Sequence, residues 1–360
     1  MKTTHKTAAP MAKGTVGPLH GAYQNVVILT DAHSTLNSAQ IEMRFRNVLQ
    51  WVHDERAKRS LMPKDIQLSP LNSKPALPQV VHITDIPSGN VDYAAYAMYC
   101  AYRALGRSRP NIFIHMVDAA DIPAHTVPDR SMFVTDYGNV FLGPNNGSLG
   151  LIRKYFEERD GVESALFALD RDRIEELEQH RMEEPEYSIP ATFQGRDVLA
   201  VAAGLLAGGL TPMQVGKLVK AGQPMQLPFV QHMVNLPQQL NKPLEAMAFC
   251  DPALGNLKTS LTLDALSFDQ LVDDNAVFRL RVKGQKKGLF GKADVVLDIK
   301  PRRVFADAAQ NELLMYLGST FAPEWDQRMV SLAVRGGNAM ARLGVTNPRV
   351  PLTLSIERLR

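Results

Sequence analysis

The chain has 360 residues, of which 45% are apolar and 21% charged, and its formal net charge at pH 7 is +3. This composition is typical of soluble globular proteins, and the length exceeds that of one ordinary core, so we expect two domains. The small charge excludes a polyanion-binding composition, and no stretch approaches the ~20 apolar residues that span a bilayer, so neither a nucleic acid nor a membrane is expected as a partner.

After a loose tail at residues 1–22, predicted strands and helices alternate. An apolar run at residues 26–30 predicts a strand, and apolar residues at helical spacing predict a helix at 38–58. A strand at 79–84, a helix at 90–105 with Asn90 as its cap, and a strand at 112–117 follow. This order predicts an α/β domain with a mostly parallel sheet and helices on both faces.

The next segment mixes turns, strands and helices. Residues 131–135 and 140–142 predict a hairpin, and a Gly-Pro-Asn-Asn-Gly loop at 143–147 leads into a predicted helix that runs to residue 157. From its spacing alone, this loop fits an anion-binding nest or a structural turn equally well. Two more helices are predicted, an exposed one at 165–180 and a closely packed, small-residue one at 198–206.

The composition changes near Gly222, where a proline-punctuated linker at residues 223–243 begins. We therefore predict one domain at 23–222 and a second at 244–360. Short alternating runs in the second domain predict strands at residues 245–249, 277–282, 294–299, 313–317, 329–334 and 352–356. Short strands at this spacing indicate a small β-barrel or sandwich, and a basic run at 283–292 is predicted to be a solvated hairpin loop.

The two cysteines, Cys100 and Cys250, have neither a disulfide pattern nor metal-ligand spacing. The N-terminal residues lack an apolar core of signal-peptide length. We therefore expect a cytoplasmic protein with free thiols.

The first predicted strand ends in Asp31-Ala32-His33, and this Asp-x-His pattern opens the signature of binuclear metallophosphoesterases. That family also needs a Gly-Asp pair and a later Gly-Asn-His or Gly-Asn-Asp, and neither occurs with suitable spacing. His82 and His115 lie inside predicted strands and are interpreted as core or rim residues. We expect no metal site, and no phosphate-binding glycine loop or Gly-x-Ser-x-Gly elbow is present.

Nine short motifs occur in order between residues 25 and 345. They lie at residues 29–31, 81–91, 117–118, 141–147, 192–197, 251–256, 305–308, 316–319 and 335–339. Their order resembles that of the S-adenosyl-L-methionine (SAM) hydroxide adenosyltransferase family, relatives of the SAM-dependent fluorinating and chlorinating enzymes. The resemblance implies a Rossmann-like N-terminal domain, a C-terminal β-barrel, and a homotrimer that holds SAM at an interface, as a substrate rather than as a cofactor.

The resemblance also implies roles for individual residues. Asp31 would accept hydrogen bonds from the ribose diol, a task suited to a carboxylate, and Phe193 would pack near the sugar. Asp251 and Ser319 would hold the amino-carboxylate end of methionine. The remaining substrate-binding positions are Leu254, which stands at the phenylalanine of the Asp-x-x-Phe-Gly-Asn motif, and the adenine-pocket positions Asn256, Phe305 and Gly336.

The implied reaction is attack of water or hydroxide on the ribose 5′ carbon, which gives adenosine and L-methionine. Members of the family share an Asp–Arg–His set that orients and activates the attacking water. Asp118 matches the aspartate. His125 stands where the arginine is expected, and Arg130, just before the next strand, is the preferred match.

Gln194 stands where the family has its histidine. Glutamine can orient a water molecule but cannot take its proton near neutral pH. Three alternatives therefore stay open: a hydrolase with another base, for which His125 is the candidate, an enzyme that uses a different nucleophile, and a non-catalytic SAM- or adenosine-binding sensor or scaffold. A metal-dependent phosphoesterase is a distant further alternative. Halide transfer is disfavoured, because Gly195 and Gly89 stand where the halogenases have serine and tryptophan.

Overall fold

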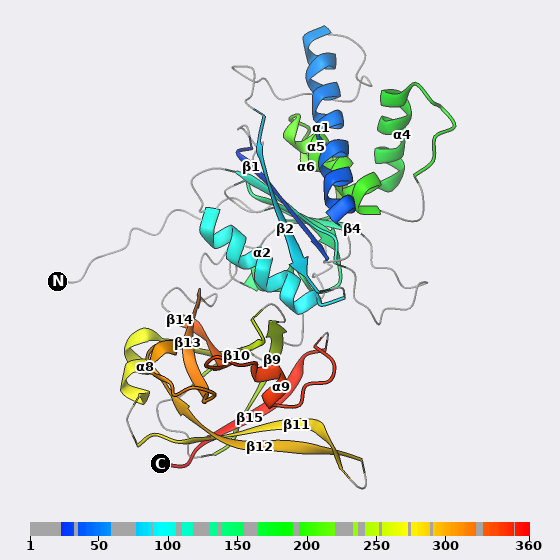
Figure 1. Ribbon diagram of the computed structural model, residues 1–360. Coiled ribbons are helices and arrows are strands. Elements are labelled where there is room, and N and C mark those ends of the chain that lie inside the picture. The colour runs from blue at the N-terminus through cyan, green and yellow to red at the C-terminus, as the bar shows by residue number, and fades with distance from the viewer. Residues whose placement is uncertain are drawn as a thin grey trace, which may run out of the picture.

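The computed structural model describes residues 23–31, 35–58, 77–87, 89–105, 110–117, 130–134, 138–154, 165–189, 194–219, 233–236, 242–251, 254–272, 275–288, 291–321, 327–348 and 350–360. These residues form an α/β domain and a β-barrel domain (Figure 1). The predicted fold class is confirmed. The exact domain boundaries stay a prediction.

The N-terminal domain is built on a seven-stranded sheet in the order β2-β1-β3-β5-β4-β6-β7. Its first four strands are parallel: β2 (Gln79–Ile86), β1 (Asn25–Asp31), β3 (Asn111–His115) and β5 (Val140–Pro144). Antiparallel pairings add β4 (Arg130–Val134), β6 (Ala165–Leu169) and β7 (Gly216–Leu218). β1 and β3 carry apolar residues on both faces because helices cover both sides of the sheet.

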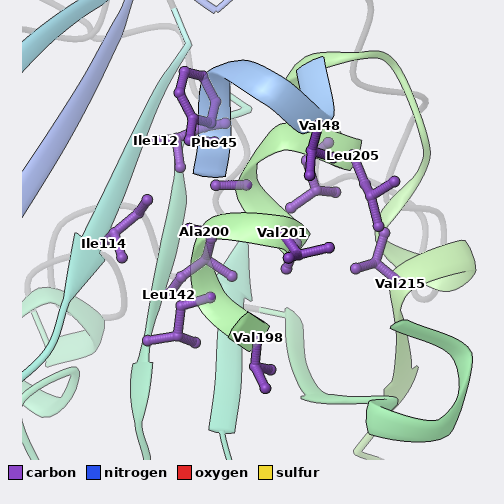
Figure 2. Close-up of a cluster of buried hydrophobic side chains, with 14 of the residues drawn as sticks. Phe45, Val48, Ile112, Ile114, Leu142, Val198, Ala200, Val201, Leu205 and Val215 are labelled. Atoms are coloured by element: carbon purple, nitrogen blue, oxygen red, sulfur yellow. The ribbon is translucent and has the colours of Figure 1, made fainter. Parts of the chain in front are cut away.

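Two apolar clusters flank this sheet. On one face, α1 (Thr35–Lys58) and α5 (Ala200–Ala207) pack on Ile28 and Ile112. On the other face, α2 (Val91–Leu105) packs on Leu29 and Phe113. Figure 2 shows Val201 and Leu205 of α5 beside Val48 of α1. The alternation of side chains along each strand divides the core into these two layers.

The prediction of a single helix at residues 165–180 is wrong. Residues 165–169 form β6, which pairs with β4 and β7, and α4 (Arg171–Met182) begins only after Asp170. The Asp170 side chain caps this helix by accepting a hydrogen bond from the Arg173 amide at 3.4 Å. An Ala-Leu-Phe-Ala-Leu run suits a strand between two partners, and this pairing outweighs its helical propensity.

The small-residue helix predicted at 198–206 is confirmed, although it begins with a π-helical turn. This turn, η2 (Gly195–Leu199), runs directly into α5, and the short α6 (Pro212–Val215) follows. π-helical turns occur frequently at functional sites, and this one follows immediately on Gln194.

The C-terminal domain is a closed barrel of seven strands. Their order is β14 (Gln327–Val334), β13 (Leu313–Phe321), β12 (Gly291–Pro301), β11 (Phe278–Gly288), β15 (Leu352–Arg358), β9 (Leu244–Asp251) and β10 (Asn256–Asp264), with β10 pairing back to β14. The six predicted strands are confirmed, and β10 was not predicted. The two-residue β8 (Val234–Asn235) adds to β10, and α8 (Ala265–Leu271), η3 (Phe305–Asp307) and α9 (Ala339–Arg342) fill the connections.

The basic run at 283–292 is not a loop, so that part of the prediction is wrong. All its residues except 289–290, which lie outside the described residues, belong to the paired strands β11 and β12. Backbone pairing decides the structure here, since strands accept charged side chains on a solvated face. The hairpin itself is confirmed.

The two domains meet where α2 lies against the barrel (Figure 1). The ring of Phe249 on β9 lies 6.5 Å from that of Tyr93 and 5.2 Å from that of Tyr96. The Asn90 side chain donates a hydrogen bond of 3.0 Å to the carbonyl of Pro348. Aromatic packing along α2 and a hydrogen bond from the residue before it therefore help to join α2 to the second domain. In the part of the chain that the structure describes, no helix has the length and apolarity to span a membrane.

Gly204 lies at a close approach of α5 to α1. A Cβ atom at Gly204 would lie 2.8 Å from Val48 Cβ and 3.0 Å from the Phe45 carbonyl oxygen. We expect Gly204→Ala to lower the free energy of unfolding by about 1–3 kcal/mol, because overpacking forces the two helices apart. Urea denaturation measures the change. In a double-mutant cycle, Val48→Ala is expected to offset part of the loss, and strict additivity of the two changes would contradict this account.

Candidate functional site

The outer face of β10 gathers polar residues toward the first domain. Leu257 and Leu261 point into the barrel core, so the alternate residues Asn256, Lys258 and Ser260 point outward. Asn256 and Lys258 are nevertheless buried, with exposed fractions of 9% and 7%. A buried polar face on a barrel indicates a binding site or a domain interface.

Asp251 and Asn256 are direct partners across β9 and β10. The Asp251 carboxylate is buried and accepts a hydrogen bond of 3.4 Å from the Leu254 amide. Gly255, with φ at +68°, completes this tight turn, a conformation that favours glycine. The turn leaves the Leu254 side chain 65% exposed.

The Asp251 carboxylate affects the pKa of two neighbouring side chains, Cys250 and Tyr316. Burial raises the pKa of the Cys250 thiol to about 12, and the nearby Asp251 carboxylate adds to this effect. Burial also raises the pKa of the Tyr316 hydroxyl, again with a contribution from Asp251. Both groups are therefore neutral near pH 7, and Cys250 is not a thiolate nucleophile.

Phe305 and Gly336 lie together beside this face. Phe305 belongs to η3 and packs edge-on against Tyr316, with 6.2 Å between the ring centroids. The Arg335 guanidinium donates to the carbonyl of Ala306 at 2.8 Å and also to that of Ala308, which ties the Gly336 turn to η3.

The residues that follow Gly336 are hydrogen-bonded to the turn after Asp251. The Gly255 carbonyl accepts hydrogen bonds from the Ala339 and Met340 amides at 2.8 and 3.1 Å. The structure therefore brings together five of the predicted substrate-binding positions of the barrel, namely Asp251, Leu254, Asn256, Phe305 and Gly336.

In the first domain, Asp31 and Gln194 both lie toward the carboxyl ends of parallel strands. Asp31 is half-buried at the end of β1, opposite Ile86. Gln194 is also half-buried, and the next residue, Gly195, packs so closely on Met116 that a Cβ would lie 1.5 Å from its sulfur atom. Met116 directly follows β3. Ligands of open α/β sheets collect at this edge.

The other predicted site residues are described only in part or not at all. Asp118, His125 and Phe193 lie outside the described residues. For Arg130 and Ser319 the structure describes only the backbone, in β4 opposite Pro144 and in β13, respectively. The Asp–Arg–Gln set and its alternative with His125 therefore stay predictions, as does the role of Phe193.

The Gly-Pro-Asn-Asn-Gly loop acts as a structural turn around His115, which is fully buried at the end of β3. The ring Nδ1 accepts a hydrogen bond of 3.2 Å from the Val117 amide, so Nε2 carries the proton and donates it to the Ser148 hydroxyl. The Asn146 side chain donates to the Val117 carbonyl at 2.9 Å. These bonds hold the chain immediately before Asp118.

His82 lies at the rim of the sheet, where its ring bridges two side chains of α1. Nδ1 lies 2.6 Å from the Ser38 hydroxyl, and Nε2 lies 2.6 Å from the Glu42 carboxylate. The interpretation of His82 as a rim residue and His115 as a core residue is confirmed. Within the described ranges, no three Cys, His, Asp or Glu side chains are grouped as a metal site would require.

Sequence reasoning missed Lys258, which lies among the predicted site residues. Its ammonium nitrogen lies 5.4 Å from the ring centroid of Tyr96 on α2, within cation–π distance. The signal was present in the sequence, because Lys258 follows Asn256 by two residues and shares its face if the segment is a strand. Because β10 was not predicted as a strand, the shared face of Asn256 and Lys258 was not predicted either.

Comparison with known proteins identifies one domain and one fold. Residues 71–216 match the family model of the SAM hydroxide adenosyltransferase N-terminal domain. No curated protein matches the chain. An uncharacterized conserved protein from Thermotoga maritima has a similar crystal structure, with a TM-score of 0.56 and 20% sequence identity over 92% of this chain and 100% of that one. At this identity the likeness shows a shared fold only.

Asp92, in the first turn of α2, is a buried carboxyl group whose Oδ1 has no hydrogen-bond partner among the described residues. Burial raises its pKa to about 7 from 3.8. As the pH rises between these two values, the unfolded state loses this proton while the folded state keeps it, so stability falls and then levels off above pH 7.

We therefore expect Asp92→Asn to remove this loss and to stabilise the protein at pH 8 by about 1–3 kcal/mol relative to the wild type, with little difference at pH 4. Chemical denaturation across this pH range measures the effect. The exposed Asp269→Asn is the control, and equal pH profiles for wild type and Asp92→Asn would refute the assignment.

Proposed function

We propose that this chain, as a member of the SAM hydroxide adenosyltransferase family, binds SAM and transfers its adenosyl group to water, giving adenosine and L-methionine. The observation that carries the proposal is the gathering of Asp251, Asn256 and Phe305 on one face of the barrel. A carboxylate, an amide and an exposed aromatic ring are the groups that an ammonium, an adenine edge and an adenine face require.

In this proposal the barrel face binds the two ends of SAM. Asp251 and Ser319 hold the amino-carboxylate end of methionine. Asn256, Phe305 and the backbone at Gly336 line the adenine pocket, and Leu254 adds apolar contact from the Asp251 turn. The burial of Asp251 strengthens its attraction for a cationic group, because little water screens it.

The first domain supplies the sugar and reaction sites. Asp31 accepts hydrogen bonds from the ribose diol, and Phe193 packs near the sugar. Asp118, Arg130 and Gln194 orient the attacking water, and the position of Gln194 at the carboxyl edge of the sheet supports this role.

The chemistry makes modest demands on the protein. The oxygen of water forms a bond to the ribose 5′ carbon while the carbon–sulfur bond breaks, and the electron pair of that bond stays on sulfur, which leaves as neutral methionine. Alignment of the water and its partial desolvation can therefore supply much of the rate. The proton released from the water passes to a base, for which His125 is the candidate because Gln194 cannot accept it.

We further propose that the chain works as a homotrimer in the cytoplasm, with SAM at a subunit interface and domains at 23–222 and 244–360. The exposure of Leu254 (65%) and Phe305 (40%) beside the site supports a surface that another subunit covers. Neither cysteine forms a disulfide bond, which suits a reducing compartment.

Incubation of the purified protein with SAM, followed by chromatography of adenosine and methionine, tests the reaction. We expect stoichiometric formation of the two products, unaffected by a chelator. Asp251→Asn is expected to weaken SAM binding about 10–100-fold, because a charge-assisted hydrogen bond is lost. The matched control is Asp298→Asn on the exposed side of β12. Equal SAM affinity in the two variants would contradict the role of Asp251.

Gln194 favours a second candidate, a SAM- or adenosine-binding sensor or scaffold without turnover. If the protein is an enzyme limited by this residue, Gln194→His is expected to raise the rate constant of adenosine formation about 10-fold or more, since a positioned general base contributes 10²–10⁴-fold in favourable cases. Binding of SAM without turnover, unchanged in Gln194→His, would leave the binding protein as the function.

A further inference from the structure

Lys258 is a buried cation on the face that carries the proposed site. It lies opposite Phe249 on β9 and Ser331 on β14, in the middle of the sheet. Its residue is 7% exposed, and its ammonium nitrogen lies 5.4 Å from the Tyr96 ring centroid. A lysine on an outer barrel face ordinarily extends into water, so its enclosure here requires a reason.

The protein only partly compensates this charge. Within the described part of the chain, the Lys258 ammonium forms no ion pair with a carboxylate. The Tyr96 ring lies within cation–π distance, and Cys100 also interacts with the ammonium electrostatically. Burial lowers the pKa of Lys258, and the charge of Asp251 opposes this effect without direct contact. A buried ammonium with so little compensation is unfavourable unless an anion approaches it.

Asp251 and Lys258 form a pair of opposite charges at a fixed spacing. Asp251 lies opposite Asn256, and Lys258 is two residues further along the same face of β10. Diagonal neighbours of this kind have Cβ atoms about 7–8 Å apart or somewhat less, so one small group can reach both side chains. A carboxylate and an ammonium at this separation match the α-ammonium and α-carboxylate groups of a free amino acid.

We propose that Lys258 binds the α-carboxylate of the methionine end of SAM while Asp251 binds its α-ammonium. This inference rests on the proposed function, since it names the chemistry of one end of that site. It makes Lys258 a specificity residue, which distinguishes SAM from analogues that carry the same sulfonium and adenosine but lack the carboxylate. The Tyr96 ring then positions the ammonium from the first domain.

Isothermal titration of SAM, decarboxylated SAM and adenosine tests the assignment. The variant is Lys258→Met, which keeps an unbranched side chain of similar length, and the matched control is Lys300→Met on the exposed side of β12. We expect Lys258→Met to weaken SAM binding about 10–100-fold and to change the affinities for decarboxylated SAM and adenosine less than about 2-fold. Lys300→Met is expected to change none of the three.

Thermal unfolding of the same variants separates binding from a structural role. Replacing an uncompensated buried charge by methionine is expected to leave the melting temperature unchanged or higher. A lower melting temperature with equal weakening of all three ligands would instead assign Lys258 to domain packing and overturn the proposal. Unchanged SAM affinity in Lys258→Met would overturn it as well.

The outcomes for this inference and for the proposed reaction are distinct. SAM binding that depends on Lys258 without adenosine formation would refute the hydrolase and keep the carboxylate site. Turnover of SAM with equal affinity for SAM and decarboxylated SAM would keep the hydrolase and refute the carboxylate site. A wild-type protein that binds none of the three ligands would refute both.

Discussion

The packing of α2 on the barrel is the contact on which the arrangement of this protein depends. Phe249 packs against both Tyr93 and Tyr96, and this aromatic contact places the outer face of β9 and β10 against the first domain. Since the side chains of a strand alternate, filling the barrel with Leu257 and Leu261 obliges Asn256 and Lys258 to face α2. Core packing inside the barrel thus determines which polar side chains face the first domain.

This junction is unusual because it encloses charge. Asp251 and Lys258 are both buried there, and a purely structural interface between domains would be at least as stable with apolar residues of similar size. Buried polar groups that do not improve stability are often functional, since they can be fully compensated only when a ligand supplies the missing partners. Burial raises the pKa of the Tyr316 hydroxyl and of the Cys250 thiol, so both neighbours of Asp251 are neutral near pH 7.

In the first domain, hydrogen bonds and close packing fix the residues at the carboxyl ends of the parallel strands. Its parallel strands end together, and a network of His115, Ser148 and Asn146 fixes the chain after β3 with hydrogen bonds to ring, hydroxyl and backbone groups. The π-helical turn after Gln194 packs on Met116, which lets a glutamine approach the same edge. Regular elements therefore hold both Asp31 and Gln194 at this edge, as the proposed alignment of a water molecule would require.

The sequence by itself determined the fold class and most of the elements, because hydrophobic periodicity is a local property of the chain. Its ordered motifs predicted the resemblance to the SAM hydroxide adenosyltransferases, whose N-terminal domain model matches residues 71–216. It misassigned residues 165–169 and 283–292 and missed β10, since backbone pairing with other strands decides the structure of those segments. It could name Asp251, Asn256 and Phe305 through their motifs, but it could not show that they converge. Only the tertiary structure revealed that Lys258 is buried, because its burial depends on a helix more than 150 residues away in the chain.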